Sequence, residues 1–145
     1  MQTFLPYPNF KESAKCLDYM RLGKERVECY QIYQCLTNKG SLRWKNHTAV
    51  KMWKGYEIAL LEYGITICDE WILRGYKDSL KNKFLFYFWK EWTHTEQVYW
   101  KYPDWFGNKD FHASHRSNLL RKNKEFYSKY GWEEPDNLKY IWPVK

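Results

Sequence analysis

Large hydrophobic side chains recur at steps of three and four residues through the middle of the chain. The stripe consists of Ala49, Trp53, Tyr56, Leu60, Tyr63, Ile67 and Trp71. Residues at this spacing share one face of an α-helix, so the pattern predicts one long amphipathic helix with that face in the core. We expect this helix to end near Arg74 with Gly75 as its cap, and Gly64 marks a position where it could bend.

The flanking segments also favour helices. Their predicted ranges are 10–19, 21–36, 80–92 and 110–122, and Asn38-Lys39-Gly40 is the expected stop of the second. Residues 84–89 would also suit a buried strand, but no other segment offers a partner strand. We therefore expect a helix over residues 80–92.

The two ends of the chain do not follow a helical pattern. Prolines within residues 1–9 predict an extended N-terminal arm, and residues 99–109 predict a loop. The segment after Trp132 is expected to be an extended tail. The side chains expected to pack this tail are Tyr140, Ile141 and Trp142. The expected fold class is all-α: a compact, single-domain helical protein over residues 1–145.

Composition then narrows the choice of partner. The 145 residues suffice for one domain with one core, and the net charge of +7 favours a polyanionic partner or a membrane surface. Aromatic residues make up 21% of the chain, and many adjoin Lys or Arg. Bases can stack on such rings while the cations neutralise phosphates, so this interleaving favours nucleic acid. The alternative for any single aromatic residue is ordinary core packing.

Other features of the sequence concern the compartment. No early charged segment is followed by an apolar stretch, and no run approaches the roughly 18 apolar residues of a membrane span. We therefore expect an intracellular protein without a membrane partner. Its four cysteines form no CxxC pair, so we expect reduced, mostly buried thiols rather than a zinc site.

The first candidate for chemistry is the predicted helix around residues 21–28. Arg21, Lys24, Glu25 and Glu28 share an arc of roughly 100° on this helix, next to its apolar side. A carboxylate at this boundary can stay ionised yet be partly desolvated, which suits a general base or a group that stabilises developing positive charge. The alternative is an exposed face with Arg21–Glu25 and Lys24–Glu28 ion pairs.

The second candidate is the predicted helix over residues 110–122. His112, His115 and Arg116 would share a face, with Arg121 and Lys122 adding positive charge at the C-terminal end. This arrangement predicts a surface that grips phosphates, whereas a plain solvated helix is the alternative. A metal site from the two histidines lacks an acidic or cysteine partner.

Further sequence signals are weaker. His47 precedes the long predicted helix, where a histidine is more often a cap or hydrogen-bonding residue than a catalyst. The chain has no G-x-S-x-G, Walker loop, dinucleotide fingerprint or H-E-x-x-H. These absences disfavour the common hydrolase, nucleotide-binding and zinc-protease classes.

Several longer motifs resemble one known family. They are the FLPY start, SAKCLDYMRLGKERVE, WKGYEIALLEYGITICDEWILRGY, HASHRSNLLRK and the late aromatic run FYSKYG. In this order they resemble the pyrimidine-dimer DNA glycosylases of the phage endonuclease V type, and more closely the less-characterised FLPY/HASHRSNLLRK relatives. The resemblance covers well over half of the chain.

The resemblance implies an all-α DNA glycosylase with apurinic-site lyase activity, no metal and no other cofactor. Its implied partner is double-stranded DNA with a damaged or modified base. In that family an N-terminal α-amine attacks the sugar and forms a Schiff base, and a glutamate of an early helix stabilises the cationic intermediate. Carried over, Glu28 is the candidate glutamate, with Glu25 as the alternative register.

The resemblance also implies DNA contacts. Arg21, Lys24 and Arg26 would contact phosphates or the lesion, although Arg26 points away from Glu28 on an ideal helix. The other residues expected at the DNA surface are His47, His112, His115, Arg116, Arg121 and Lys122.

The chain departs from the family at its start. Gln2 is bulky and should block removal of the initiator methionine, which leaves three choices: the Met1 amine, Lys24, or water without lyase activity. An α-amine has an ordinary pKa of about 7.7–8.0 against about 10.4 for a lysine, so it is the better nucleophile at neutral pH. A non-catalytic nucleic-acid-binding module and an RNA- or nucleotide-processing enzyme are the competing functions.

Overall fold

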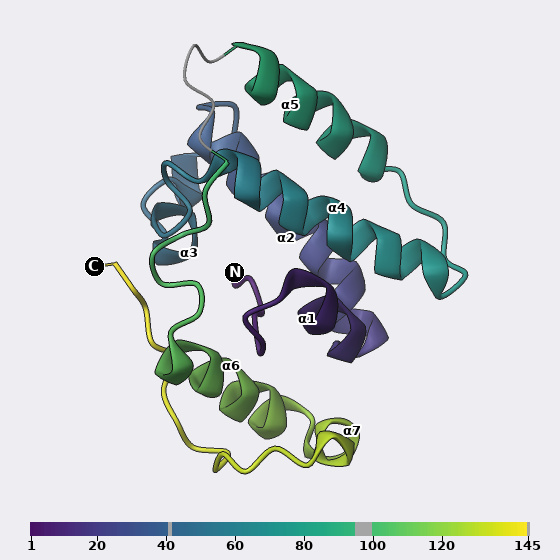
Figure 1. The fold of residues 1–145 in the computed structure, drawn as a ribbon, viewed down its shortest axis with the longest axis vertical. Coiled ribbons are helices and arrows are strands. Elements are labelled where there is room, and N and C mark those ends of the chain that lie inside the picture. The colour runs from purple at the N-terminus through teal and green to yellow at the C-terminus, as the bar shows by residue number, and fades with distance from the viewer. Residues whose placement is uncertain (41, 95–99, 145) are drawn as a thin grey trace.

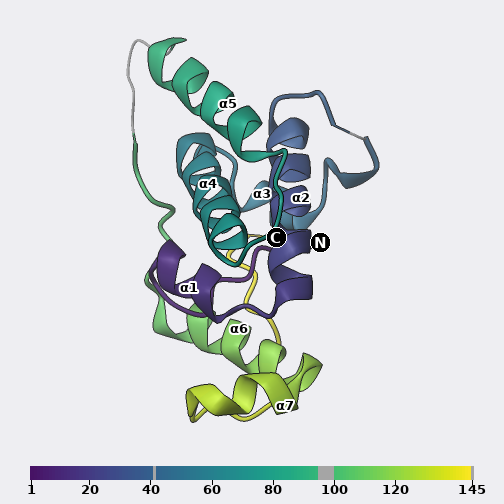
Figure 2. The ribbon, with the colours of Figure 1, turned by 90° about the vertical axis from the view of Figure 1, so that its right-hand side faces the viewer.

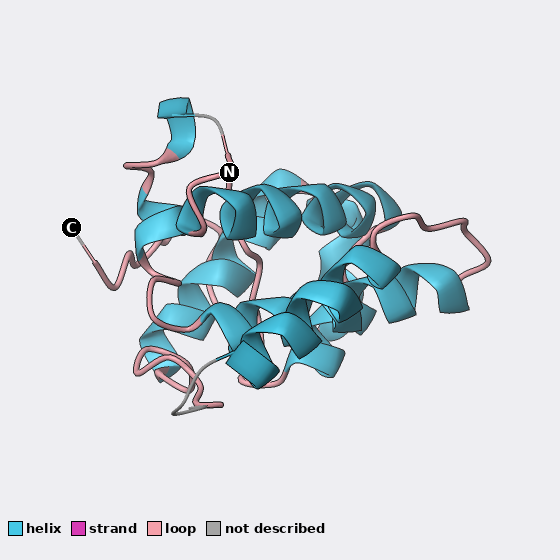
Figure 3. Cartoon of the chain, turned by 90° about the horizontal axis from the view of Figure 1, so that it is seen from above, coloured by secondary structure: helices cyan, strands magenta, loops and turns pink. Residues whose placement is uncertain are grey.

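The computed structural model describes residues 1–40, 42–94 and 100–144. Within these ranges the chain forms α-helices and short 3-10 turns without a strand, which confirms the all-α prediction (Figure 3). The helices are α1 (Phe10–Cys16), α2 (Tyr19–Leu36), α3 (Thr48–Lys51), α4 (Glu57–Leu73), α5 (Lys81–His94), α6 (Lys109–Lys122) and α7 (Lys124–Tyr127). The 3-10 turns are η1 (Leu42–Trp44) and η2 (Ser128–Tyr130).

Helix α4 is the centre of the helical packing, with α2 and α5 against it and α1 across it (Figures 1 and 2). Gly64 lies inside α4, where a Cβ atom would come within 2.8 Å of the Phe84 ring and 3.0 Å of the Cys29 sulfur. The missing side chain therefore allows α5 and α2 to approach α4 closely.

The prediction of one long helix through the hydrophobic stripe is wrong. The chain forms α3 and then α4, separated by residues 52–56, and Gly55 has a φ of 88° that a helix does not permit. The stripe is nevertheless buried on both sides of the break, as the full burial of Ala49 in α3 and of Tyr63 in α4 shows. The break keeps the same face inward, so hydrophobic spacing alone could not reveal it.

Other predicted boundaries are confirmed. Helix α2 ends before Asn38, which has a φ of 62°, and α4 ends at Leu73 before Gly75, whose φ is 95°. The predicted helix over residues 80–92 is α5, and residues 100–108 form the expected loop, while residue 99 lies outside the described residues.

The N-terminal segment (residues 1–9) is non-helical as expected, but it is not an arm on the surface. It runs through the middle of the molecule between α6 and the α1–α2–α4 group (Figure 1). Thr3 and Leu5 are fully buried, and the Trp53 indole donates to the Thr3 hydroxyl at 3.1 Å. The core is thus built around this segment.

The tail after Trp132 is extended and runs back along α6. Main-chain bonds hold it there: Ser117 Oγ accepts from Leu138 N at 2.9 Å, and Ser114 Oγ accepts from Ile141 N at 3.2 Å. Its expected packing through three side chains is only partly correct, because Tyr140 is half-buried whereas Ile141 and Trp142 are exposed. Hydrogen bonds rather than apolar burial place the tail.

The cysteines and the hydrophobicity of the helices test two further expectations. All four cysteines are buried and none forms a disulfide, so the prediction of buried thiols is confirmed. None of the helices in the described ranges is both long and apolar enough to cross a membrane.

Candidate active site

A pocket of about 500 Å³ opens where the start of α2, the chain's N-terminus, the end of α6 and the tail meet. Several of the residues singled out in the sequence come together around it. Its lining comprises Met1, Gln2, Phe4, Asp18, Met20, Arg21, Lys24, Glu25, Glu28, Lys122, Asn123, Tyr140 and Trp142. Residues from four separate parts of the chain therefore share one cavity.

The first turn of α2 is fixed by Asp18. This N-cap carboxylate accepts from Arg21 N at 3.3 Å and pairs with the Arg21 guanidinium at 3.1 Å, and the Tyr127 hydroxyl also bonds it. Burial by itself raises the pKa of Asp18, but the hydrogen bonds from Tyr127 and Arg21 outweigh it, so the pKa lies below its ordinary value. Arg21 is thereby held at the pocket with a quarter of its side chain exposed.

Glu28 lies about two turns beyond Arg21 along α2 and faces the N-terminus. Its Oε2 accepts from Gln2 N at 3.2 Å, and its Oε1 lies 3.5 Å from Lys24 Nζ. Only 11% of its side chain is exposed. A nearly buried carboxylate therefore lies one residue from the chain's α-amine.

Glu25 is more deeply buried and has different partners. Its Oε2 accepts from Phe4 N at 3.0 Å and bonds the Tyr63 hydroxyl, which lies 3.0 Å from the Phe4 carbonyl oxygen. Burial raises the pKa of Glu25 well above its ordinary value, although the bond from Tyr63 acts in the opposite direction. The alternative of an exposed ion-pair face is correct only for the Lys24–Glu28 pair, because both glutamates are buried and Arg21 pairs with Asp18 instead of Glu25.

The N-terminal amine belongs to the same electrostatic site. Met1 lines the pocket. The positive charge of the amine opposes the rise that burial causes in the pKa of Glu25, and it adds to burial in lowering the pKa of His47. Gln2 is buried, and its Oε1 accepts from Thr3 N at 2.9 Å. The start of the chain is thus held in place rather than free.

Two lysines add charge at the mouth of the pocket. Lys24 is 74% exposed in its side chain and reaches back to Glu28, and Lys122 projects from the last turn of α6. With Arg21 they place three cations around an acidic interior, which favours an anionic ligand whose reacting part becomes positive.

Arg26 does not join this site. Its guanidinium pairs with the buried carboxylate of Asp78 and lies 4.5 Å from the centre of the Trp71 ring. This position, on the far side of α2 from Glu28, agrees with the ideal-helix geometry. An arginine held in this way does not fit the expected role of a lesion or phosphate contact at the pocket.

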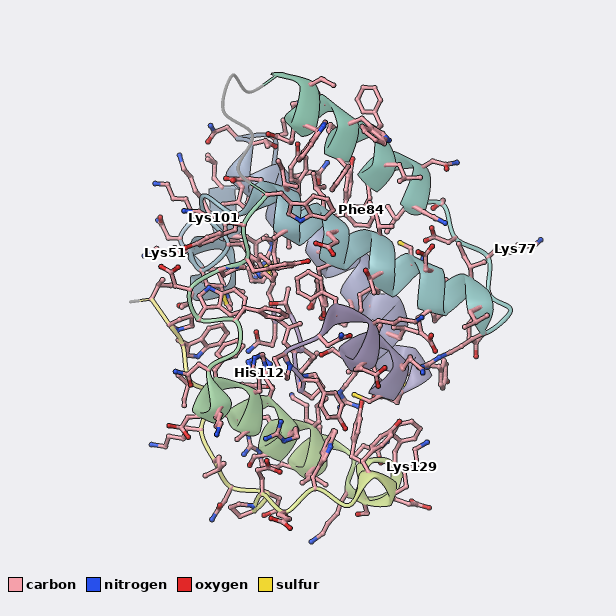
Figure 4. All side chains as sticks on the ribbon, in the orientation of Figure 1. Lys51, Lys77, Phe84, Lys101, His112 and Lys129 are labelled. Atoms are coloured by element: carbon pink, nitrogen blue, oxygen red, sulfur yellow. The ribbon has the colours of Figure 1, made fainter. Side chains whose placement is uncertain are left out.

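The expectation that the histidines of α6 line a DNA surface is corrected by their burial. His112 and His115 are 2% and 0% exposed, and both contact the main chain of Leu5. Figure 4 shows His112 directed from α6 toward the centre of the molecule. The N-terminal segment covers this face of α6, a contact between residues about 110 positions apart that no local pattern reveals.

The arginines of α6 bond other parts of the chain, Arg116 in a partly buried position and Arg121 at the surface. Arg116 pairs with Glu134 and donates to the Pro6 carbonyl at 2.7 Å. Arg121 donates to the carbonyls of Asp136 and Leu138, each at 3.3 Å. Of the α6 residues expected at DNA, Lys122 alone lines the pocket.

His47 lies at the edge of the site. It caps α3 by accepting from Ala49 N at 3.0 Å, as is typical of a histidine before a helix, and its ring adjoins those of Trp44 and Trp142. Burial first, and then the N-terminal charge, lowers the pKa of His47, while Glu28 acts against them. Its role as a DNA contact stays a prediction.

Sequence reasoning missed several residues of the site. Asp18 had a signal, since an acidic residue directly before a helix is a common N-cap. Tyr63 was assigned only to the hydrophobic stripe, although a buried tyrosine needs a partner for its hydroxyl. Met20, Tyr140 and Trp142 reach the pocket only through the tertiary fold. Within the described ranges, no group of three or more His, Cys, Asp or Glu could hold a metal ion.

An all-helical fold with paired carboxylates beside the chain's amine, inside a rim of cations, defines a site for an anionic substrate. The family model of the pyrimidine dimer DNA glycosylases matches residues 1–84, more than half of the chain. The chain therefore belongs to this family, whose substrate is DNA. No curated protein and no solved structure matches the chain. The matched range contains the N-terminal segment and both glutamates, whereas α6 and the tail lie beyond it.

Proposed function

We propose that this protein is a DNA glycosylase and apurinic-site lyase that uses the α-amine of Met1 as its nucleophile and Glu28 as its acidic partner. The observation that carries this proposal is the bond from Gln2 N to Glu28 inside the pocket. It holds the start of the chain against a carboxylate, so both functional groups can reach one sugar.

The proposed chemistry proceeds in balanced steps. The neutral amine attacks C1′ of the damaged nucleotide, the glycosidic bond breaks, and the base leaves with the bonding electrons and takes up a proton. The nitrogen then passes one proton to O4′ as the C1′–O4′ bond breaks, and the opened sugar carries a protonated Schiff base at C1′. Loss of a C2′ proton to Glu28 then expels the 3′-phosphate, and water hydrolyses the Schiff base to free the amine.

Burial distinguishes the two glutamates. Glu25 is fully enclosed with a raised pKa, so its carboxyl tends to be neutral and it holds Phe4 and Tyr63 in place. Glu28 keeps part of its side chain exposed to the pocket and lies next to Lys24. We therefore assign the stabilisation of the cationic intermediate to Glu28.

The choice of nucleophile follows similar reasoning. A lysine is ordinarily protonated at pH 7, whereas an α-amine is free to a much larger extent. Lys24 is also exposed and directed at Glu28. We therefore assign the attack to Met1, and we assign phosphate contacts to Lys24, Arg21 and Lys122.

The pocket volume suits an extruded nucleotide. A cavity of about 500 Å³ holds a single nucleotide rather than a stacked duplex step. Extrusion costs a few kcal/mol and least at damaged sites, which favours lesions. The proposed substrate is thus a duplex with a damaged or modified pyrimidine.

The proposal predicts covalent capture of abasic DNA. Borohydride should trap the wild-type protein on duplexes with an abasic site or a thymine dimer, and the modified peptide should be the one that begins with Met1. Glu28→Gln should lower the rate of strand cleavage by roughly 10²–10³-fold, the typical effect of removing one stabilising group. Glu12→Gln is the matched control, because Glu12 is an exposed surface carboxylate.

Three results would contradict the proposal in different ways. Modification of Lys24 instead of Met1 would overturn the nucleophile. Salt-dependent binding without base release, cleavage or trapping would indicate a binding module. A preference for RNA over matched DNA would indicate an RNA-processing enzyme.

A further inference from the structure

Three polar side chains of α6 face the N-terminal segment and take no part in the chemistry proposed above. His115 and Arg116 follow His112 by three and four residues, so the three side chains form one patch on α6 that bonds the N-terminal segment. Both histidines are buried, and Arg116 has 19% of its side chain exposed. Buried polar groups need partners. All three side chains bond main-chain atoms of the N-terminal segment, Arg116 also pairs with Glu134, and His115 Nε2 has no hydrogen-bond partner among the described residues.

This patch bonds three main-chain groups in succession. His115 Nδ1 accepts from Leu5 N at 3.0 Å, and His112 Nδ1 lies 2.7 Å from the Leu5 carbonyl oxygen. Arg116 Nη1 donates to the Pro6 carbonyl at 2.7 Å. We call these three side chains the α6 clamp.

The clamp requires two neutral histidines in opposite tautomers. Gly107 N donates to His112 Nε2 at 2.9 Å, so the His112 proton lies on Nδ1 and is donated to Leu5. His115 accepts at Nδ1, so its proton lies on Nε2. Burial lowers the pKa of both rings, and that of His115 to about 3, which keeps both neutral near pH 7.

The opposite edge of the same segment is bonded by α2. Gln2 N donates to Glu28 at 3.2 Å and Phe4 N donates to Glu25 at 3.0 Å, whereas Leu5 N turns to His115 on α6. The segment is therefore fixed from both sides within four residues of Met1. Removal of either side would allow the amine to shift relative to Glu28.

We propose that the α6 clamp positions the N-terminal amine for reaction, so that His112 and His115 are positioning residues of the active site. This inference rests on the proposed function, because it concerns the same amine. Loss of the clamp should lower the reaction rate strongly, since a displacement of about 1 Å at a reacting atom can lower a rate by roughly 10²-fold.

The test compares His115→Leu with His115→Asn. Leucine removes the acceptor of Leu5 N, whereas asparagine can offer its Oδ1 near the position of Nδ1. His115→Leu should lower kcat for abasic-strand cleavage by roughly 10–100-fold with KM nearly unchanged. His115→Asn should restore most of the loss. His112→Asn, which keeps a donor for the Leu5 carbonyl, supplies a second variant if the leucine protein does not fold.

Ser117→Ala is the matched control. Ser117 is equally buried on α6, but its hydroxyl serves Leu138 of the tail and not the N-terminal segment. It should lose stability as His115→Leu does and yet keep kcat. Equal losses of kcat in the two variants would overturn the clamp as a positioning device, as would full kcat in His115→Leu.

Hydrogen exchange in the free protein separates this inference from the proposed function. His115→Leu should speed exchange of the Leu5 and Phe4 amides while leaving the amides of α4 unchanged. Faster exchange with unaltered kcat would overturn the positioning role and leave the proposed function intact. An inert wild-type protein would overturn the proposed function, and unchanged exchange in His115→Leu would overturn the clamp itself.

Discussion

At the scale of single residues, two glutamates one helical turn apart have different properties. Glu25 is 1% exposed and serves the main chain of Phe4, and Glu28 is 8% exposed and opens onto the pocket. The difference in surroundings raises the pKa of Glu25 by desolvation and leaves Glu28 accessible to a ligand. Chemically identical side chains thus take a structural and a proposed catalytic role.

The pKa of His115 predicts a loss of stability in acid. It lies at about 3, against about 6.5 in an unfolded chain, so the unfolded state binds more protons between these values. The free energy of unfolding should therefore rise with pH across this window and fall as pH drops from about 6.5 toward 3. Urea unfolding at pH 7, 5.5 and 4.5 measures how the free energy of unfolding changes with pH. His115→Asn should flatten this dependence, by a few kcal/mol over the whole window.

Glu25 affects the pH dependence of stability in the opposite direction to His115. Its raised pKa means that the folded state holds the proton more tightly, so its contribution to stability is lost as pH rises above about 4.5. The wild-type protein and His115→Asn both contain Glu25. The difference between their pH slopes of unfolding free energy therefore reports on His115. Parallel slopes in the two proteins would contradict the assignment of a neutral, buried His115.

At the scale of elements, close packing of α4 against α5 depends on Gly64. Gly64→Ala should gain up to about 1 kcal/mol of helix propensity but lose about 1–3 kcal/mol through overpacking. The overpacking should win because Phe84 and Cys29 are fully buried and lie within 3.0 Å of the added carbon. Chemical denaturation should show a net loss of about 1–2 kcal/mol.

A double mutant tests whether Phe84 is the cause. Phe84→Leu removes the ring from the position of the new methyl group, so Gly64→Ala should cost less in that background, with a coupling of roughly 0.5–3 kcal/mol. Additive effects would mean that the clash lies elsewhere. Figure 4 shows Phe84 between α5 and α4.

Elements also show where sequence patterns succeed and fail. Periodicity located α2, α5 and α6 to within a few residues, because each helix has its own hydrophobic spacing and end signals. It joined α3 and α4 into one helix, because the turn at Gly55 preserves the inward face. Patterns report which side chains are buried and are insensitive to a break that keeps them buried.

At the scale of the whole molecule, the net charge of +7 predicts DNA binding that weakens with salt. Cations at the pocket should account for most of this salt dependence. Lys122→Ala should weaken binding to an abasic duplex and reduce the slope of log K against log salt by about 1. Lys90 is an exposed residue of α5, a helix that contributes no residue to the pocket lining, and Lys90→Ala should leave the slope nearly unchanged.

Fluorescence anisotropy at several salt concentrations measures both variants. Equal reductions in slope would place DNA over α5 as well as over the pocket and would contradict the proposed binding side. A slope unaffected by Lys122→Ala would remove this residue from the interface.

The sequence alone determined the helical class, most helix boundaries, the buried stripe and the family resemblance. The helical class, the boundaries and the stripe follow from local propensity and spacing, which act between residues a few positions apart, whereas the resemblance rests on motifs and their order. The sequence also identified Glu25 and Glu28 together as candidate site residues, because both lie on one predicted helix. Their surroundings could not be predicted in this way.

Only the tertiary structure decided which polar side chains of α2 and α6 contact the N-terminal segment. Gln2 reaches Glu28 across 26 positions, and Leu5 reaches His115 across 110. Main-chain donors and acceptors have no sequence signature, yet each buried one must find a partner. That requirement turned the expected DNA-facing histidines inward and placed the start of the chain beside an acidic side chain.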